Sequence, residues 1–243
     1  MKLGKDAYGH EMWAYFQGKN NFEIIERDDG YIDVSDLPKL YFSKYKDWPE
    51  YEKRVLRLVK GKVLDIGCGV GRHSLYLQGR GFNVIGIDNS PLAIKICRIK
   101  GLKKVRTMSI DQINKFRSNF FDIVIMLGSN FGLLSSFKKA KMLLKVLYKI
   151  TTPNALIIAE SRDPYKTDDP AHLEYHKLNK KRDRMAGQIR IRVRFRKYVG
   201  DWFDYLFVSK IEMKQILKNT GWKVKKFISP KYKAQYIAVI EKV

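Results

Sequence analysis

From Lys62 onward, short apolar runs alternate with stretches whose apolar residues recur at helical spacing. Such runs are typical of strands buried on both faces, and their alternation with helices is typical of a parallel sheet. Strands are predicted at 63–67, 82–88, 103–108, 121–127 and 155–160, with helices near 71–80, 90–100 and 136–150. The pattern therefore indicates an α/β chain built on a doubly wound, mostly parallel sheet.

The first 60 residues add a different pattern. Apolar residues stand on both sides of Asp29-Gly30, a strong hairpin signal because Gly tolerates the positive φ of a tight turn. An aromatic cluster precedes this hairpin, and helical spacing follows it from about Trp48 to Lys60. We interpret residues 1–60 as an N-terminal cap or lid.

The last third departs from simple alternation of strands and helices. Asp168-Asp169-Pro170 is a typical helix start and predicts a helix to about Arg182. Residues 188–208 then alternate between apolar and polar positions, which predicts a β-hairpin turning near Gly200. A helix near 209–220 and two strand-like segments, 222–228 and 236–243, would close the sheet.

Length and composition fit one core in one domain. The chain has 243 residues, of which 45% are hydrophobic and 30% charged, as in soluble globular proteins. No apolar run approaches the roughly 20 residues that span a bilayer, and the first residues lack the apolar stretch of a secretory signal. Cys68 and Cys97 are too few for a disulfide framework. We expect a cytoplasmic protein with reduced thiols and no membrane partner.

The chain is strongly basic, with 48 Lys and Arg against 25 Asp and Glu and a formal net charge of +23. More than half of the excess lies in residues 171–243. This charge is consistent with a surface that binds polyanions, but a proteome whose soluble surfaces are generally basic is the favoured explanation.

The stretch Asp65-Ile66-Gly67-Cys68-Gly69-Val70-Gly71 lies where a buried strand is predicted to turn into a helix. Glycines let the backbone approach a ligand closely, and the first N–H groups of a helix can bind a negative group. Ligands of open α/β sheets bind at such turns, outside the carboxyl ends of the strands. The spacing is neither that of dinucleotide sites nor that of phosphate-binding P-loops. A different nucleotide-like cofactor is expected.

This Asp-x-Gly-x-Gly-x-Gly pattern resembles motif I of class I S-adenosylmethionine-dependent methyltransferases. Asp88 ends the next strand about 20 residues after the first glycine, where an acid of that family binds both ribose hydroxyls. The resemblance covers residues 50–160 well and the closing strands more loosely. The chain also resembles an uncharacterised prokaryotic group of these enzymes with an ERDDGY-type N-terminal segment.

The resemblance implies a Rossmann-like, mostly parallel seven-stranded sheet with a final antiparallel strand, an N-terminal cap and a β-hairpin insertion. We expect one methyltransferase domain over 1–243, with a cap at 1–60, a cofactor-binding core at 61–160, a substrate-side insertion at 161–208 and closing elements at 209–243. S-adenosylmethionine is the implied cofactor and S-adenosylhomocysteine its product. The implied cofactor contacts are Asp65, Gly67, Cys68, Gly69, Gly71, Asp88, Asn89, Ile110, Asp111 and Leu127.

The absence of several motifs reduces the classes of acceptor that this chain is expected to methylate. Residues 127–130 read LGSN, unlike the [DN]-P-P-[YF] loop of relatives that methylate amide or exocyclic base nitrogens. Neither cysteine follows the fourth strand, where cytosine-C5 enzymes hold a nucleophile, and no acid trio like that of catechol-type enzymes indicates a metal. No catalytic residue is identified, because methyl transfer from a sulfonium requires mainly the positioning of the acceptor.

Candidate acceptor contacts lie on the added segments and at the strand ends. The alternating arginines from Arg190 to Arg196 would repel one another unless they are solvated, paired with acids or facing an anion. The histidines could make ordinary hydrogen bonds, and the N-terminal aromatic residues could pack over the sheet. Substrate contact is the alternative for both groups. The candidates are Tyr8, His10, Trp13, Tyr41, Asn130, Arg162, Tyr165, His176, Arg192 and Arg194.

Three functions remain open. The leading hypothesis is methyl transfer to a small molecule held under a cap formed by residues 1–60 and 161–208. The alternative is a tRNA or rRNA methyltransferase that uses the basic C-terminal third to bind the phosphate backbone. A third interpretation is a cofactor-binding protein without transferase activity. The oligomeric state is not predicted.

Overall fold

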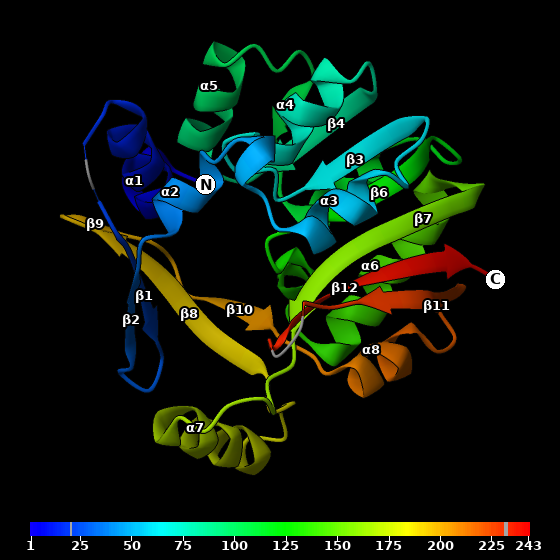
Figure 1. Cartoon of the computed structure of the whole chain (residues 1–243). Helices are drawn as coiled ribbons and strands as arrows, with labels where there is room; N and C mark the ends of the chain where they lie inside the picture. The colour runs from blue at the N-terminus through cyan, green and yellow to red at the C-terminus, as the bar shows by residue number, and fades with distance from the viewer. Residues whose placement is uncertain (20, 231–232) are drawn as a thin grey trace. The chain divides into compact units, whose positions relative to one another are not determined.

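The computed structural model describes residues 1–19, 21–230 and 233–243. Seven strands form one sheet in the order β11-β12-β7-β6-β3-β4-β5 (Figure 1). The β4–β5 and β6–β7 pairs are parallel, whereas β12 runs antiparallel to both β7 and β11. The strands are β3 (Lys62–Ile66), β4 (Asn83–Asp88), β5 (Val105–Thr107), β6 (Phe121–Met126), β7 (Thr151–Arg162), β11 (Trp222–Ile228) and β12 (Gln235–Lys242). This arrangement confirms the predicted mostly parallel sheet with an antiparallel strand near its end.

A second, smaller sheet has the order β10-β8-β1-β2, with β9 also paired to β8. Its strands are β1 (Glu23–Arg27), β2 (Ile32–Ser35), β8 (Gln188–Phe195), β9 (Tyr198–Val199) and β10 (Phe203–Leu206). The hairpin predicted at Asp29-Gly30 is confirmed, since β1 and β2 pair antiparallel and Gly30 has a φ of 90°. This smaller sheet joins segments that are far apart in sequence, since β8 pairs antiparallel with β1.

The second predicted hairpin turns earlier than expected. Phe195 pairs with Tyr198, so the chain reverses at Arg196 and Lys197 and not near Gly200. Arg196 has a φ of 51°, a conformation for which an arginine gives no sequence signal. Gly200 follows β9, and its N–H donates to the Val193 carbonyl at 2.9 Å.

The chain divides into two compact units, which are described separately. The first comprises Met1–Trp48, Leu64–Ile110 and Arg190–Phe203. The second comprises Pro49–Val63, Asp111–Ile189 and Asp204–Val243. No helix among the described residues is long and apolar enough to cross a membrane.

The helices of the first unit are α1 (Ala7–Phe16), α2 (Leu37–Tyr41), α4 (Arg72–Gly79) and α5 (Pro91–Ile99), with short 3-10 turns at Leu3–Lys5 and Tyr45–Asp47. Of these, α1 and α5 begin at residues whose side chains cap them, whereas α2 and α4 have no side-chain cap. Ser90 caps α5 by accepting a hydrogen bond from the Ala93 N–H, and Pro91 occupies the first helical position as predicted. The buried face of α5 carries Ala93, Ile94, Ile96 and Cys97.

Asp6 ties α1 to α5. Its Oδ1 accepts a hydrogen bond from the Gly9 N–H at 2.9 Å, which caps α1. Its Oδ2 accepts from Ser90 Oγ at 2.9 Å and from the Leu92 N–H at 3.1 Å. Because the Asp6 side chain is fully buried, these bonds replace the water that the carboxylate loses on folding. The contact holds the N-terminal helix against the helix that follows β4.

We expect Asp6→Ala to lower the free energy of unfolding by about 2–4 kcal/mol, because it removes a helix cap and leaves buried donors unpaired. Urea denaturation followed by circular dichroism would measure the loss. Asp201→Ala is the matched control, since Asp201 makes only an exposed ion pair with Lys5 at 3.4 Å. Its effect should stay within about 0.5 kcal/mol. Equal effects of the two substitutions would contradict the structural role of Asp6.

The second unit contains β6, β7, β12 and β11 together with helices. The helices are α3 (Glu50–Leu56), α6 (Phe137–Ile150), α7 (Pro170–Lys181) and α8 (Lys210–Leu217), with 3-10 turns at Ile110–Lys115 and Asn130–Leu134. Of these helices, α3 contacts β12 and α8 contacts β11. In α6, Leu143, Leu144 and Leu147 face the core, and the Trp222 indole donates to the Leu144 carbonyl at 2.9 Å. Asp169 caps α7 ahead of Pro170, as the sequence predicts.

Candidate functional site

The glycine turn between β3 and α4 has the conformation that its sequence predicts. Gly67, Gly69 and Gly71 have φ values of 71°, 52° and 83°, a region in which other residues are strained. The N–H groups of Gly67 and Cys68 both donate to the Ile87 carbonyl, at 2.9 and 3.0 Å. We call residues 67–71 the glycine loop; these bonds hold it against the carboxyl end of β4.

Asp88 joins the glycine loop to the start of α5. Its Oδ2 accepts a hydrogen bond from the Gly69 N–H at 2.9 Å, and its Oδ1 accepts from the Ser90 N–H at 2.9 Å. Removal from water raises the pKa of this carboxyl to about 6, against the lowering effect of the two N–H groups. Asp88 is therefore mostly ionised at neutral pH and can accept further hydrogen bonds. The following residue, Asn89, is exposed.

Asp65, the first residue of the motif, lies beneath the loop. It is 2% exposed, and its Oδ2 accepts a hydrogen bond from Ser74 Oγ at 2.6 Å. Burial raises the pKa of Asp65, while the nearby His73 and the Ser74 hydroxyl oppose this rise. The side chain thus attaches α4 to β3, which fixes the position of the loop between them.

Both thiols lie at the loop and are buried. Cys97 Sγ donates to the Gly69 carbonyl at 3.2 Å. A hydrogen bond with Cys97 and burial raise the pKa of the Cys68 thiol well above its usual range. The Cys68 side chain packs in a buried cluster with Ile94, Cys97, Leu102 and Val105.

Aromatic residues of α1 and α2 lie beside the glycine loop. The Tyr8 hydroxyl lies so close to Gly69 that a Cβ on this glycine would be 2.7 Å from the hydroxyl oxygen. The rings of Tyr8 and Tyr41 meet edge to face with centroids 5.8 Å apart. Lys95 Nζ lies 4.4 Å from the ring centroid of Trp13. Tyr8, Trp13 and Tyr41 all pack against a buried cluster of Met12, Val70, Ala93 and Ile96.

His10 makes other contacts. Its ring stacks on Tyr198 with centroids 3.5 Å apart, and its Nε2 is 3.2 Å from the Leu3 carbonyl oxygen. His10 therefore connects α1 to β9.

Two buried glutamates, on α1 and β1, were not among the predicted site residues. Glu11 on α1 is fully buried, and both of its carboxyl oxygens lack a hydrogen-bond partner. Glu23, the first residue of β1, is 3% exposed and hydrogen-bonds with Tyr41. Burial, and then the charge of Glu23, raises the pKa of Glu11 to about 8. Burial, and then the charge of Asp33, raises the pKa of Glu23 to about 7.

The central arginines of β8 are paired with an acid. Arg192 binds Glu26 with two hydrogen bonds, from Nε at 2.8 Å and from Nη2 at 2.9 Å. Arg194 Nη1 donates to the same carboxylate at 3.1 Å, and the Arg192 guanidinium lies 4.5 Å from the ring centroid of Trp202. Among the three arrangements expected for the arginine row, pairing with an acid therefore accounts for Arg192 and Arg194.

The remaining predicted cofactor contacts lie after β5 and β6. Ile110 is half-buried at the start of the 3-10 turn Ile110–Lys115, and Asp111 makes an ion pair with Lys139 at 2.8 Å. Leu127 is buried directly after β6. The N–H of the next residue, Gly128, donates to Glu160 Oε2 at 2.7 Å. Glu160 was not among the predicted site residues.

The other acceptor candidates of the second unit are spread over several elements. Asn130 begins the 3-10 turn after β6. Arg162, the last residue of β7, lies 5.7 Å from the ring centroid of Phe207. The Tyr165 hydroxyl donates to Glu212 at 2.8 Å, and its ring is 6.0 Å from that of His176. Within the described parts of the chain, no group of three or more His, Cys, Asp or Glu residues is placed to hold a metal ion.

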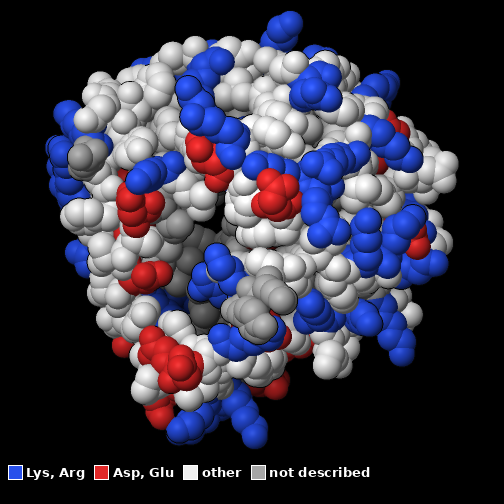
Figure 2. Space-filling model, in the orientation of Figure 1, with Lys and Arg blue, Asp and Glu red and all other residues white. Residues whose placement is uncertain are grey.

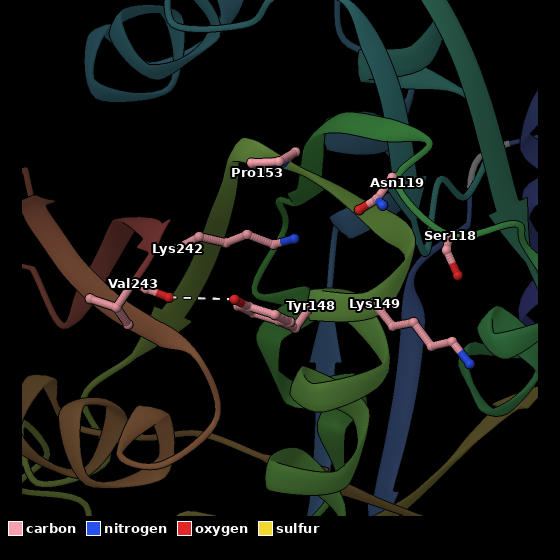
Figure 3. Close-up of a pocket in the computed structure, with 7 residues that line it drawn as sticks. All are labelled: Ser118, Asn119, Tyr148, Lys149, Pro153, Lys242 and Val243. Atoms are coloured by element: carbon pink, nitrogen blue, oxygen red, sulfur yellow. Dashed lines mark hydrogen bonds between the residues drawn. The ribbon is translucent and has the colours of Figure 1, made fainter.

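A hollow of about 540 Å³ in the second unit lies at the amino ends of β6 and β7, away from the carboxyl ends that hold ligands in such sheets (Figure 3). Lys242 Nζ donates to the Thr151 carbonyl at 2.7 Å, and the Tyr148 hydroxyl reaches the Val243 carbonyl at 3.5 Å. Figure 2 shows Lys and Arg spread over much of the visible face, with smaller groups of Asp and Glu between them. The basic charge is therefore not confined to this hollow.

Comparison with known proteins agrees with the site geometry. Residues 64–159 match the model of the methyltransferase domain family. A crystal structure of a SAM-dependent methyltransferase from Bacteroides fragilis, in complex with S-adenosyl-L-homocysteine, superposes with a TM-score of 0.84. It shares 23% sequence identity, and the alignment covers 100% of this chain and 97% of the other. Residues 64–159 thus resemble a methyltransferase domain, and the chain has the fold of class I S-adenosylmethionine-dependent methyltransferases.

Curated relatives match only in part. A tRNA (uracil(54)-C(5))-methyltransferase from Pyrococcus horikoshii is 35% identical over 33% of this chain and 21% of its own length. A glycine/sarcosine N-methyltransferase from Halorhodospira halochloris is 28% identical over 42% of this chain and 40% of its own length. The chain therefore spans less than half of the length of either relative. The family match does not include the ERDDGY segment, which precedes residue 64.

Proposed function

We propose that this protein is an S-adenosylmethionine-dependent methyltransferase that acts on a small molecule. The observation that carries the proposal is the pairing of Asp88 with the glycine loop at the carboxyl edge of the sheet. The positive φ values of the three glycines and the match over residues 64–159 support it.

The residues present fit this cofactor. The Asp88 carboxylate is ionised at neutral pH and has lone pairs left to accept hydrogen bonds from two ribose hydroxyls. Gly67 and Gly69 of the glycine loop are half-buried, and a side chain at Gly69 would meet the Tyr8 hydroxyl. Bound S-adenosylmethionine would supply an activated methyl group on its sulfonium. The protein would hold it, exclude water and orient the acceptor.

The N-terminal cap supports a small acceptor. In the first unit, Asp6 fixes α1 against α5, and this places the Tyr8 hydroxyl at the glycine loop. A cap so close to the cofactor loop favours an acceptor that fits within the protein. The glycine/sarcosine N-methyltransferase relatives act on molecules of that size.

Incubation with methyl-labelled S-adenosylmethionine and a cell extract at two salt concentrations would test this function. We expect label in the low-mass fraction, with little dependence on salt. Label released by RNase and lost at high salt would instead support an RNA acceptor, because RNA binding weakens steeply as phosphate contacts are screened. Tight cofactor binding with no transfer to any fraction would indicate a binding protein and overturn the proposal.

A further inference from the structure

The two buried glutamates of the cap have no cation beside them. No salt bridge joins Glu11 or Glu23 to a Lys or Arg of the described residues, although the protein carries 48 such residues. Buried carboxylates are normally paired or hydrogen-bonded, since an isolated buried charge costs several kcal/mol. The charged or titratable groups that act on this pair are themselves acidic: Asp33 on β2, and Tyr8 and Tyr41. The pair therefore lacks a positive partner.

The glutamates are connected to the glycine loop through two tyrosines. Glu23 hydrogen-bonds with Tyr41, and the Tyr41 ring meets the Tyr8 ring edge to face. The Tyr8 hydroxyl lies at Gly69 and feels the charges of both Glu23 and Asp88. Burial, and then the charge on Tyr41, raises the pKa of Tyr8, so its hydroxyl keeps its proton. Glu23 is thus linked through Tyr41 and Tyr8 to the glycine loop, beside which the cofactor would bind.

We propose that Glu23, backed by Glu11, forms the cation-binding wall of the acceptor site, and that the acceptor is a small amine. This inference rests on the proposed function. An amine enters as its ammonium ion, which supplies the positive partner that the pair lacks. Phenolate and carboxylate acceptors carry the opposite charge and are repelled there.

Glu23 also has a proton-transfer role. The ammonium nitrogen gives its proton to a Glu23 carboxylate oxygen, which leaves a neutral amine with a free electron pair. That pair forms the new N–C bond to the methyl carbon as the S–C bond breaks, and the positive charge passes from sulfur to nitrogen. A carboxyl with a pKa of about 7 is suited to accept and release this proton at neutral pH. Burial, together with the charge of the nearby Glu23, raises the pKa of Glu11 to about 8, so Glu11 stays mostly protonated when Glu23 is ionised.

The first test identifies the product class. Labelled low-mass product formed by the wild-type protein from the extract should be retained on a strong cation exchanger at acid pH, as amines are. Neutral or anionic labelled product would overturn the inference and leave the methyltransferase function intact. Absence of any transfer would instead count against the proposed function itself.

The second test uses variants. We expect Glu23→Gln to reduce transfer at least 100-fold near neutral pH, with S-adenosylmethionine affinity by calorimetry changed less than threefold. Glu23→Asp should retain more activity and shift the pH profile of transfer. Glu26→Gln is the matched control on the same strand, because its carboxylate pairs with Arg192 and Arg194. Wild-type rates in Glu23→Gln would show that the buried pair is only structural.

A third measurement needs no cofactor. Dimethylammonium chloride should raise the Tm of the wild-type protein relative to sodium chloride at equal ionic strength, because it binds the folded state. Glu23→Gln should abolish this difference. The same rise in both proteins would place the ammonium elsewhere and contradict the assignment.

Discussion

Asp88→Ala is expected to weaken S-adenosylmethionine binding at least 100-fold, as measured by isothermal titration calorimetry. The carboxylate would accept two hydrogen bonds from the ribose, and hydrogen bonds to charged groups contribute about 1.5–3 kcal/mol each. The substitution also removes the acceptor for the N–H groups of Gly69 and Ser90, so the glycine loop loses its contact with the start of α5. Circular dichroism would verify that the fold is retained.

The same residue gives the binding a defined pH dependence. The pKa of Asp88 is about 6 without cofactor, and the ionised form is the better acceptor. Affinity should therefore be constant above this pH and fall about tenfold per unit below it. Glu50→Ala is the control, because Glu50 is exposed and forms an ion pair with Lys53 at 2.9 Å. Wild-type affinity in Asp88→Ala would remove this carboxylate from the site.

Glu11→Gln is expected to stabilise the protein at alkaline pH. Burial raises the pKa of Glu11 from 4.5 to about 8, so the group is neutral in the folded state where it is already ionised in the unfolded state. The contribution of Glu11 to the free energy of unfolding is fully present below pH 4.5 and is lost progressively as the pH rises towards 8. At about 1.4 kcal/mol per pKa unit, the full loss is of the order of 5 kcal/mol.

Urea denaturation at pH 5 and pH 8 would measure this effect. The Gln variant should match the wild-type protein at pH 5 and exceed it by about 3–4 kcal/mol at pH 8, since glutamine stays neutral throughout. Glu174→Gln is the control, because Glu174 is exposed and forms an ion pair with Lys177 at 2.8 Å. A Gln variant that is less stable at both values would mean that Glu11 is not buried in its neutral form.

The sheet and the glycine loop could be predicted because local sequence determines them. The signals come from neighbouring residues in the sequence. They are the apolar strand runs bounded by glycine, the cap Ser90 followed by Pro91, and the glycines that the structure places at positive φ. The acid that ends β4 is likewise recognised by its distance from the loop. These features require little knowledge of what packs against them.

The buried acids could not be predicted because tertiary contacts produce them. Glu11 follows His10 on a short helix, and a glutamate in such a place is normally solvent-exposed. Its burial depends on packing against elements distant in sequence. Asp6 is similar, since its partner Ser90 is far along the chain. The hairpin turn was misplaced for a different reason: alternation continues through Arg196, whereas Gly200 offered the conventional turn signal.

The position of β12 has a consequence for the order in which the second unit can assemble. β12 lies between β7 and β11, yet it follows both of them in the chain. During ribosomal synthesis, β11 emerges before the strand that links it to the rest of the sheet. The backbone N–H and C=O groups of β11 cannot pair with the sheet before β12 is present. This edge of the sheet can therefore be completed only after the residues through Lys242 have been translated.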